Sequence, residues 1–234
     1  MTHKRSFTAF ATMLVAASSF AQMTQPAAAP FGQTAMYKSY DLKTIEPAVT
    51  AAEWTTYDQT LEKRAEEVLQ DLALTDASKA DHVKSSVIDY YKFLRGWHDQ
   101  QDAKMEELNK DAKGNASKIV EERKDLTAGH EAFVSDLGSI LTPAQVEMVK
   151  DRLCYKRPTI MYEGFTQQNP WLTAEQKAGV KKICDDAREL AMDGGSSKEK
   201  HRIMDKYKGR LTNYIASAKK AAATQQTDAT QPSR

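Results

Sequence analysis

The amino-acid sequence predicts an all-α protein, in which an antiparallel helical hairpin and shorter C-terminal helices form a helical bundle. Three observations support this prediction. The chain of 234 residues contains 10 Gly and 7 Pro, which favours long helices over many short strands. Apolar residues recur at spacings of three and four through most of the chain. Several helix starts also carry typical N-capping residues.

The composition limits the classes of function. The chain has 33 basic and 32 acidic residues, and 28% of it is charged while 41% is hydrophobic. These values are typical of a folded globular domain rather than of a disordered chain or a membrane bundle. Proteins that bind nucleic acid usually show a basic excess, so we expect no nucleic-acid partner.

Residues 1–21 are predicted to be a secretory signal peptide. Lys4 and Arg5 precede an apolar run over residues 7–20, and a small-x-small pattern ends at Ala21. The run is shorter than the roughly 20 residues that span a bilayer, and we expect no transmembrane span elsewhere. Cleavage near Ala21 would place the protein in the periplasm or outside the cell. Residues 22–50 contain several prolines and no helical period, and are predicted to be an extended linker.

The helical domain is predicted over residues 51–220, and its second and third helices form the hairpin. A first helix carries an apolar stripe over 54–72, and a second, over 80–108, keeps a spacing close to 3.5 residues. The Lys-Gly-Asn sequence at 113–115 breaks this pattern before a third helix over 119–137. Long amphipathic helices joined by a short turn are expected to pack antiparallel.

Three further helices have clear N-terminal signals. Thr142 and Thr173 are each followed three residues later by Gln, which is the reciprocal capping box, and Ser196 is followed by Glu in the same way. The helix from Thr173 is expected to end in a left-handed cap at Gly194 and Gly195. The tail over residues 221–234 is rich in Ala, Thr, Gln and Ser and is predicted to be disordered.

The segment from Tyr155 to Trp171 is predicted to be a long loop, because it holds two prolines and four aromatic residues. Long loops in compact domains are usually functional. Aromatic rings that stack on sugar faces, beside amides that bind hydroxyls, would form a carbohydrate site. The alternative is that the rings close the open end of the bundle. The candidate ligand-binding residues are Tyr155, Tyr162, Phe165, Gln167, Asn169 and Trp171.

A second candidate cluster combines His98, Asp102 and His130. His98 and Asp102 are four residues apart and share a helix face, a spacing that suits a metal pair or an acid-base couple. His130 lies on the apolar stripe of the antiparallel helix and would approach His98 in one register of the hairpin. The alternative is a buried His98 that Asp102 orients as a packing contact. Because the sequence offers no second ligand pair, no metal site is predicted.

A third group of polar residues surrounds the Gly-Gly-Ser-Ser turn at 194–197. Helix N-termini after such turns attract anions, so a phosphate, sulfate or uronate group is a candidate ligand. The alternative is an ordinary capped corner between two helices. Motifs of common hydrolases, zinc proteases and nucleotide-binding proteins do not occur in the sequence, and no cofactor is predicted. The candidate residues of this group are Arg188, Asp193, His201 and Lys208.

The two cysteines, Cys154 and Cys184, could form a disulfide in an oxidising compartment. The alternative is two separate buried thiols, since free cysteine is among the most buried residue types. Neither cysteine belongs to a C-x-x-C motif, so the sequence offers no signal for redox chemistry or a zinc ribbon.

Several segments of the chain resemble one known family. They are the runs ARELAMDGGSSKEKH at 187–201, KYKGRLTNY at 206–214, LTPAQ at 141–145, the 155–171 segment, and His98-Asp99-x-x-Asp102. Over about residues 60–216 the chain is similar to the family known as domain of unknown function 3826. These are exported bacterial proteins described as candidate sugar-binding proteins. The resemblance implies a carbohydrate ligand and supplies no catalytic residues.

We therefore expect an exported, non-catalytic protein that binds carbohydrate or a related small ligand. Two alternatives remain. The Leu-Thr-x-x-Gln pattern at Leu141 and Leu172 resembles a repeated motif of small periplasmic helical chaperones, which favours a chaperone or scaffold. A glycan-processing enzyme would need paired carboxylates at a cleft, and the sequence singles out no such pair. The sequence does not predict an oligomeric state.

Overall fold

The computed structural model describes residues 51–229, with side chains from Thr55 to Ala221. Within this range the chain forms eight helices and no strand, which confirms the predicted all-α fold. None of the helices in the described range is both long and apolar enough to cross a membrane. The predicted signal peptide (1–21) and linker (22–50) lie outside the described residues.

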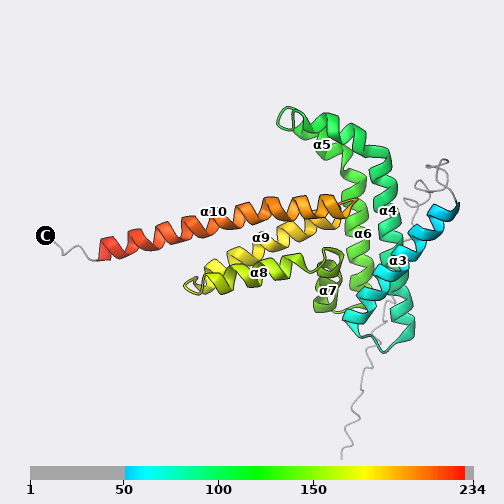
Figure 1. Ribbon diagram of the computed structural model, residues 1–234, viewed down its shortest axis with the longest axis horizontal. Coiled ribbons are helices and arrows are strands. Elements are labelled where there is room, and N and C mark those ends of the chain that lie inside the picture. The colour runs from blue at the N-terminus through cyan, green and yellow to red at the C-terminus, as the bar shows by residue number, and fades with distance from the viewer. Residues whose placement is uncertain (1–50, 230–234) are drawn as a thin grey trace, which may run out of the picture.

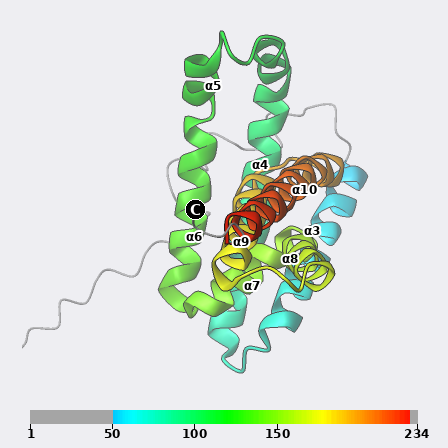
Figure 2. The same cartoon turned by 90° about the vertical axis from the view of Figure 1, so that its left-hand side faces the viewer.

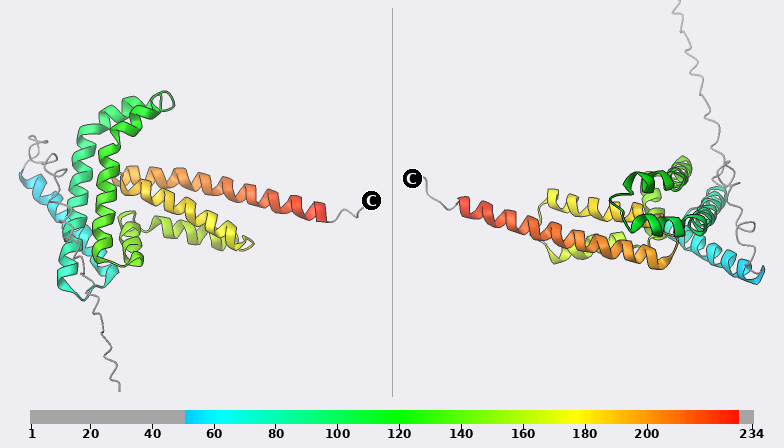
Figure 3. Two further views of the ribbon diagram at one scale, coloured as in Figure 1. Left: turned by 180° about the vertical axis from the view of Figure 1, so that it is seen from behind. Right: turned by 90° about the horizontal axis from the view of Figure 1, so that it is seen from above.

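The helices form two arms that cross at a junction (Figure 1). The first arm contains α3, α4 and α6, with α5 at its far end, while the second contains α8, α9 and α10, and α7 lies at the junction. When the second arm is viewed end on, α4 and α6 stand upright behind it (Figure 2). Beyond α8 and α9, α10 continues alone (Figure 3). The helix bounds are α3 Ala51–Leu72, α4 Ala77–Asn109, α5 Ala116–Glu122, α6 Lys124–Ile140, α7 Pro143–Leu153, α8 Arg157–Gln168, α9 Ala174–Met192 and α10 Ser197–Ala229.

The predicted hairpin is present as the antiparallel pair of α4 and α6. The rings of Tyr90 and Phe133 stack across this interface with their centroids 4.1 Å apart, and both are fully buried. Burying one such large apolar side chain stabilises the fold by about 1.5–3 kcal/mol. A buried carboxylate, Asp136, also joins the pair, because His82 Nε2 lies 2.9 Å from its Oδ1 and the Ser86 hydroxyl donates to it. The hairpin therefore forms one side of the core.

The single helix predicted over 119–137 is wrong, because the chain forms two helices that are interrupted at Arg123. Arg123 is at once the C-cap of α5 and the N-cap of α6, and its backbone (φ −86°, ψ 0°) departs from helical geometry. Apolar periodicity continues across this break, which is why the sequence pattern did not reveal it. The interruption leaves Arg123 beside the junction, where its side chain contacts Asp193.

The predicted capping boxes at Thr142 and Thr173 are confirmed, each with both reciprocal hydrogen bonds to its Gln. At the start of α10 the Ser196 hydroxyl accepts from the backbone N–H of Glu199 at 3.1 Å. The left-handed cap predicted for Gly194 and Gly195 is wrong, since no glycine among the described residues has a positive φ. Gly195 is required for space instead, because a Cβ there would lie 2.5 Å from Cγ of His98.

The segment predicted as a loop from Tyr155 to Trp171 is mostly helix α8. Pro158 lies in its first turn, where a missing N–H leaves no helical hydrogen bond unmade. Pro170 follows the end of α8, so the two prolines bound a helix rather than a loop. Only Tyr155 and Lys156, with φ of 59° and 56°, form a tight left-handed connection between α7 and α8.

The structure bears on two further predictions, the disordered tail over residues 221–234 and the disulfide between Cys154 and Cys184. Backbone helix α10 continues to Ala229, so most of the predicted disordered tail (221–234) is helical where it is described. Ala and Gln are good helix formers, which explains the continuation. Cys154 and Cys184 form no disulfide and are buried in two separate apolar clusters. Burial raises the pKa of their thiols to about 12 and about 11, which keeps both protonated at neutral pH.

The close packing of the hairpin can be tested at one glycine of α6. A Cβ at Gly129 would lie 2.2 Å from the buried ring of Phe93, whereas a Cβ at Gly138 would meet nothing within 4 Å. Gly129→Ala should therefore destabilise the protein by about 1–3 kcal/mol through overpacking. Gly138→Ala, the matched control in the same helix, should be neutral or stabilise by up to about 1 kcal/mol. Urea unfolding measures both changes, and equal effects would contradict this packing.

Candidate functional site

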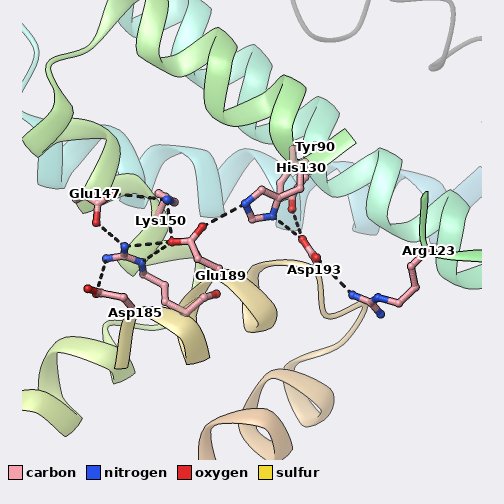
Figure 4. Close-up of polar contacts among 10 residues, drawn as sticks. Tyr90, Arg123, His130, Glu147, Lys150, Asp185, Glu189 and Asp193 are labelled. Carbon is pink, nitrogen blue, oxygen red and sulfur yellow. Dashed lines mark hydrogen bonds and ion pairs between the residues drawn. The ribbon is translucent and has the colours of Figure 1, made fainter. Parts of the chain in front are cut away.

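Asp193, the C-cap residue of α9, joins the two arms (Figure 4). Its Oδ1 accepts from His130 Nδ1 of α6 at 2.7 Å and from the Tyr90 hydroxyl of α4 at 3.0 Å. Its Oδ2 lies 3.5 Å from the guanidinium of Arg123. The carboxylate is 13% exposed, so these contacts replace most of its hydration. Asp193 therefore fixes the end of the second arm against the first.

Glu189, one turn earlier on α9, extends this contact to α7 (Figure 4). Its carboxylate lies 3.2 Å from His130 Nε2 and 2.7 Å from Lys150 Nζ. Arg188 contacts Glu189 at 3.1 Å and also pairs with Glu147 of α7. The result is a row of alternating charges across the junction, in which each buried charge has an opposite neighbour.

The pKa values of two groups in this row are strongly shifted. Burial alone would lower the pKa of His130, but hydrogen bonds to Asp193 and Glu189, and the charges of both, raise it to about 9. Burial would raise the pKa of Glu189, but hydrogen bonds from His130 and Lys150, and the charges of Lys150 and Arg188, lower it to about 2. At neutral pH the junction therefore holds an imidazolium between two carboxylates.

His98 of α4 links this junction to a neighbouring pocket. Its Nε2 donates to the backbone carbonyl of Asp193 at 2.7 Å, and its Nδ1 lies 2.7 Å from Asp102 Oδ1. Both ring nitrogens of His98 therefore have a hydrogen-bond partner, one on each arm. The ring lies so close to the α9–α10 turn that a Cβ at Gly195 would be 2.5 Å from its Cγ. Only glycine leaves space for the ring at this position.

The pocket has a volume of about 460 Å³ and lies between the arms. Its walls come from α3, α4, the left-handed connection at Tyr155, and the turn over 194–197 with the start of α10. This size is typical of small-molecule sites. The pocket therefore draws on segments that are up to about 140 residues apart in the chain, from Tyr57 to Lys200.

Three tyrosines, Tyr57, Tyr91 and Tyr155, line the pocket. The Tyr57 hydroxyl donates to the backbone carbonyl of Tyr91 at 3.3 Å, which joins α3 to α4. Burial raises the pKa of Tyr57 to about 12, with a smaller opposing effect of Arg95. Tyr155 is different, because its ring is 39% exposed and stacks on His201 with centroids 5.7 Å apart. It is thus the ring most available to a ligand.

The structure distributes the sequence-predicted residues over three places. The pocket contains His98, Asp102 and Tyr155, and His201 supports Tyr155. The junction behind it contains His130, Arg188 and Asp193. Tyr162 and Phe165 pack against the small core of the second arm, as the alternative of a closing plug required. The other predicted residues of the aromatic segment, Gln167, Asn169 and Trp171, lie around the α8–α9 turn at the far end of that arm, and Lys208 is exposed on α10.

Sequence reasoning missed several residues of the pocket. Tyr57 and Arg64 of α3, Tyr91 and Arg95 of α4, and Lys200 of α10 all line it. Each lies within a regular helix, and their sequence spacing carries no signal of a common site. Among residues 55–221, no group of three or more His, Cys, Asp or Glu side chains is arranged to hold a metal ion.

A comparison with family models identifies the family of the chain. The model described as Protein of unknown function (DUF3826) matches residues 58–231. The chain belongs to this family. The match includes every residue of the pocket wall except Tyr57, so the junction and the pocket both lie within the DUF3826 domain. A search of curated proteins finds no match to the chain.

The charged junction predicts a specific pH dependence of stability. The pKa of His130 is raised from 6.5 to about 9, so its contribution is complete below pH 6.5 and is lost as the pH rises through 9. The free-energy difference between the wild type and His130→Gln should shrink with a slope of up to about 1.4 kcal/mol per pH unit. Urea unfolding between pH 6 and pH 10 measures this difference. A difference that stays constant over that range would contradict the assignment.

Proposed function

We propose that this DUF3826 protein is an exported protein that binds a saccharide in the pocket between its arms, without catalysing a reaction. The observation that carries the proposal is the pairing of an exposed aromatic ring with hydrogen-bonding groups in one cavity of about 460 Å³. Saccharide sites need a flat apolar surface for the sugar ring and polar groups for its hydroxyls. Small-ligand pockets generally combine the two in this way.

Tyr155 supplies the flat surface. Its backbone is left-handed, at φ 59°, a conformation that costs a residue other than glycine about 1–3 kcal/mol and persists only where neighbours enforce it. The ring rests on His201 at an interplanar angle of 16°. His201 is held in turn, because its Nδ1 donates to the carbonyl of Ser197 at 2.6 Å. The exposed face of Tyr155 is thereby preorganised, which reduces the entropic cost of binding.

Polar groups around this ring are suited to sugar hydroxyls. Asp99, Asp102 and Glu199 provide carboxylates, Arg95 a guanidinium, and Ser197 a hydroxyl, all on the wall of the pocket. Ionised carboxylates accept hydrogen bonds and guanidinium groups donate them, so a sugar hydroxyl can donate to one group and accept from another. The pocket therefore offers hydrogen-bond partners beside a stacking surface.

The carboxylates support binding rather than hydrolysis. Asp102 and Glu199 both face Nδ1 of His98, at 2.7 and 4.0 Å. A glycosidase uses one carboxyl group as a proton donor, usually in apolar surroundings, and a second across the scissile bond. Asp102 is 67% exposed and both groups lie beside an imidazole, so neither has those surroundings.

The export part of the proposal rests on residues 1–21. Their basic start, short apolar run and small-x-small ending are those of a signal peptide. Expression of the full chain in a bacterial host, followed by N-terminal sequencing of the periplasmic fraction, tests it. A mature N-terminus at residue 22 is expected, and an uncleaved cytoplasmic chain would contradict export.

The binding proposal is tested by replacing Tyr155. Glycan-array screening followed by calorimetry should find a saccharide that binds, and Tyr155→Ala should weaken this binding about tenfold, which corresponds to about 1.4 kcal/mol of lost stacking. Trp171→Ala is the matched control, because Trp171 is 41% exposed but lies in the distant α8–α9 turn. Equal effects of the two variants would contradict the pocket as the site. Absence of saccharide binding, together with suppression of client aggregation, would favour a chaperone instead.

A further inference from the structure

Most charged groups on the pocket wall already have a partner, which is either a group of opposite charge or a backbone N–H. The Arg95 guanidinium lies 3.1 Å from Asp99, and the His98 imidazole lies 2.7 Å from Asp102. Glu199 accepts from the backbone N–H of Gly195 at 3.1 Å. Because these carboxylates are engaged, they oppose an incoming anion less than their number suggests.

Arg64 of α3 is the exception. It makes no ion pair with any residue of the described range, and its guanidinium lies over the Tyr91 ring, 4.9 Å from Cζ to the centroid. Tyr91 is 9% exposed, so the guanidinium rests on a largely buried ring at the pocket wall. The guanidinium carries five N–H donors, and none of them is used in an ion pair with a residue of the described range.

Lys200 of α10 lies near the same ring. Its Nζ is 5.4 Å from the Tyr91 centroid and donates to the carbonyls of Leu153 and Met192, at 3.1 and 3.4 Å. The residue is 4% exposed, and burial, with the nearby charge of Arg64, lowers its pKa. Arg64 and Lys200 therefore both lie near one largely buried ring, and neither makes an ion pair with a residue of the described range. An anion bound beside the Arg64 guanidinium would be stabilised by its positive charge.

We propose that the saccharide bound by this pocket carries an anionic group, and that Arg64 binds this group. The inference rests on the proposed saccharide function and specifies its ligand class. A planar guanidinium fits a carboxylate or a sulfate ester through two parallel N–H···O bonds, whereas a neutral hydroxyl uses only one. Arg64 thus favours acidic sugars, with the anionic group against α3 and the sugar ring on Tyr155.

Calorimetry with three matched sets of oligosaccharides tests the inference: neutral galactose oligomers, oligogalacturonates and sulfated galactose oligomers. We expect one of the two anionic sets to bind about 10- to 100-fold more tightly than the neutral set, with an affinity that falls as salt is added. The preferred set identifies the anionic group as carboxylate or sulfate. Arg64→Gln should reduce the affinity for this set to that for the neutral oligomers.

Lys63→Gln is the matched control, because Lys63 is the exposed neighbour of Arg64 on α3 and does not line the pocket. It removes the same charge and should leave all affinities within about twofold. Equal binding of neutral and anionic sets, unchanged in Arg64→Gln, would overturn the inference and leave the saccharide function standing. Failure of all three sets, and of a wider glycan screen, would overturn both. Thermal unfolding of each variant establishes that it is folded before binding is compared.

Discussion

The Asp193 carboxylate is the contact on which the arrangement of the two arms depends. His130, Tyr90 and Arg123 bind its side chain, while His98 binds its backbone carbonyl. Each partner belongs to the first arm, and Asp193 itself ends α9 of the second. Removing one member of a buried ion pair typically costs about 3–5 kcal/mol, because the partner charge is left uncompensated. Apolar packing brings the arms together, but this set of directional contacts fixes how they meet.

The same contacts shape the pocket. The Nε2 of His98 binds the Asp193 carbonyl and its Nδ1 binds Asp102, so both nitrogens fix the ring in place on the pocket wall. The turn at 194–197 follows Asp193 directly, and Gly195 allows it to pass against that ring. A ligand site between two separately packed units gains precision when its wall is part of their joint. The junction therefore serves both the stability of the fold and the geometry of the site.

Much of the fold could be predicted because helix formation is governed by local rules. Apolar periodicity and the capping boxes at Thr142 and Thr173 depend on residues three or four apart, and the structure confirms them. The errors arose where one local signal permits two outcomes. Proline suits a loop or the first turn of a helix, so Pro158 was misinterpreted, and glycine suits a left-handed cap or a close approach, so Gly195 was too.

The sequence by itself determined the helical class, most helix boundaries, and the candidate residues His98, Asp102 and Tyr155 that line the pocket. The sequence grouped Tyr155 with Trp171, whereas the structure places Tyr155 at the same pocket as His98. The tertiary structure alone decided that Arg64 and Lys200 face one tyrosine ring, and that Asp193 meets His130. These partners are separated by tens of residues, and their contact follows from how two arms cross, which no periodicity within a single helix encodes.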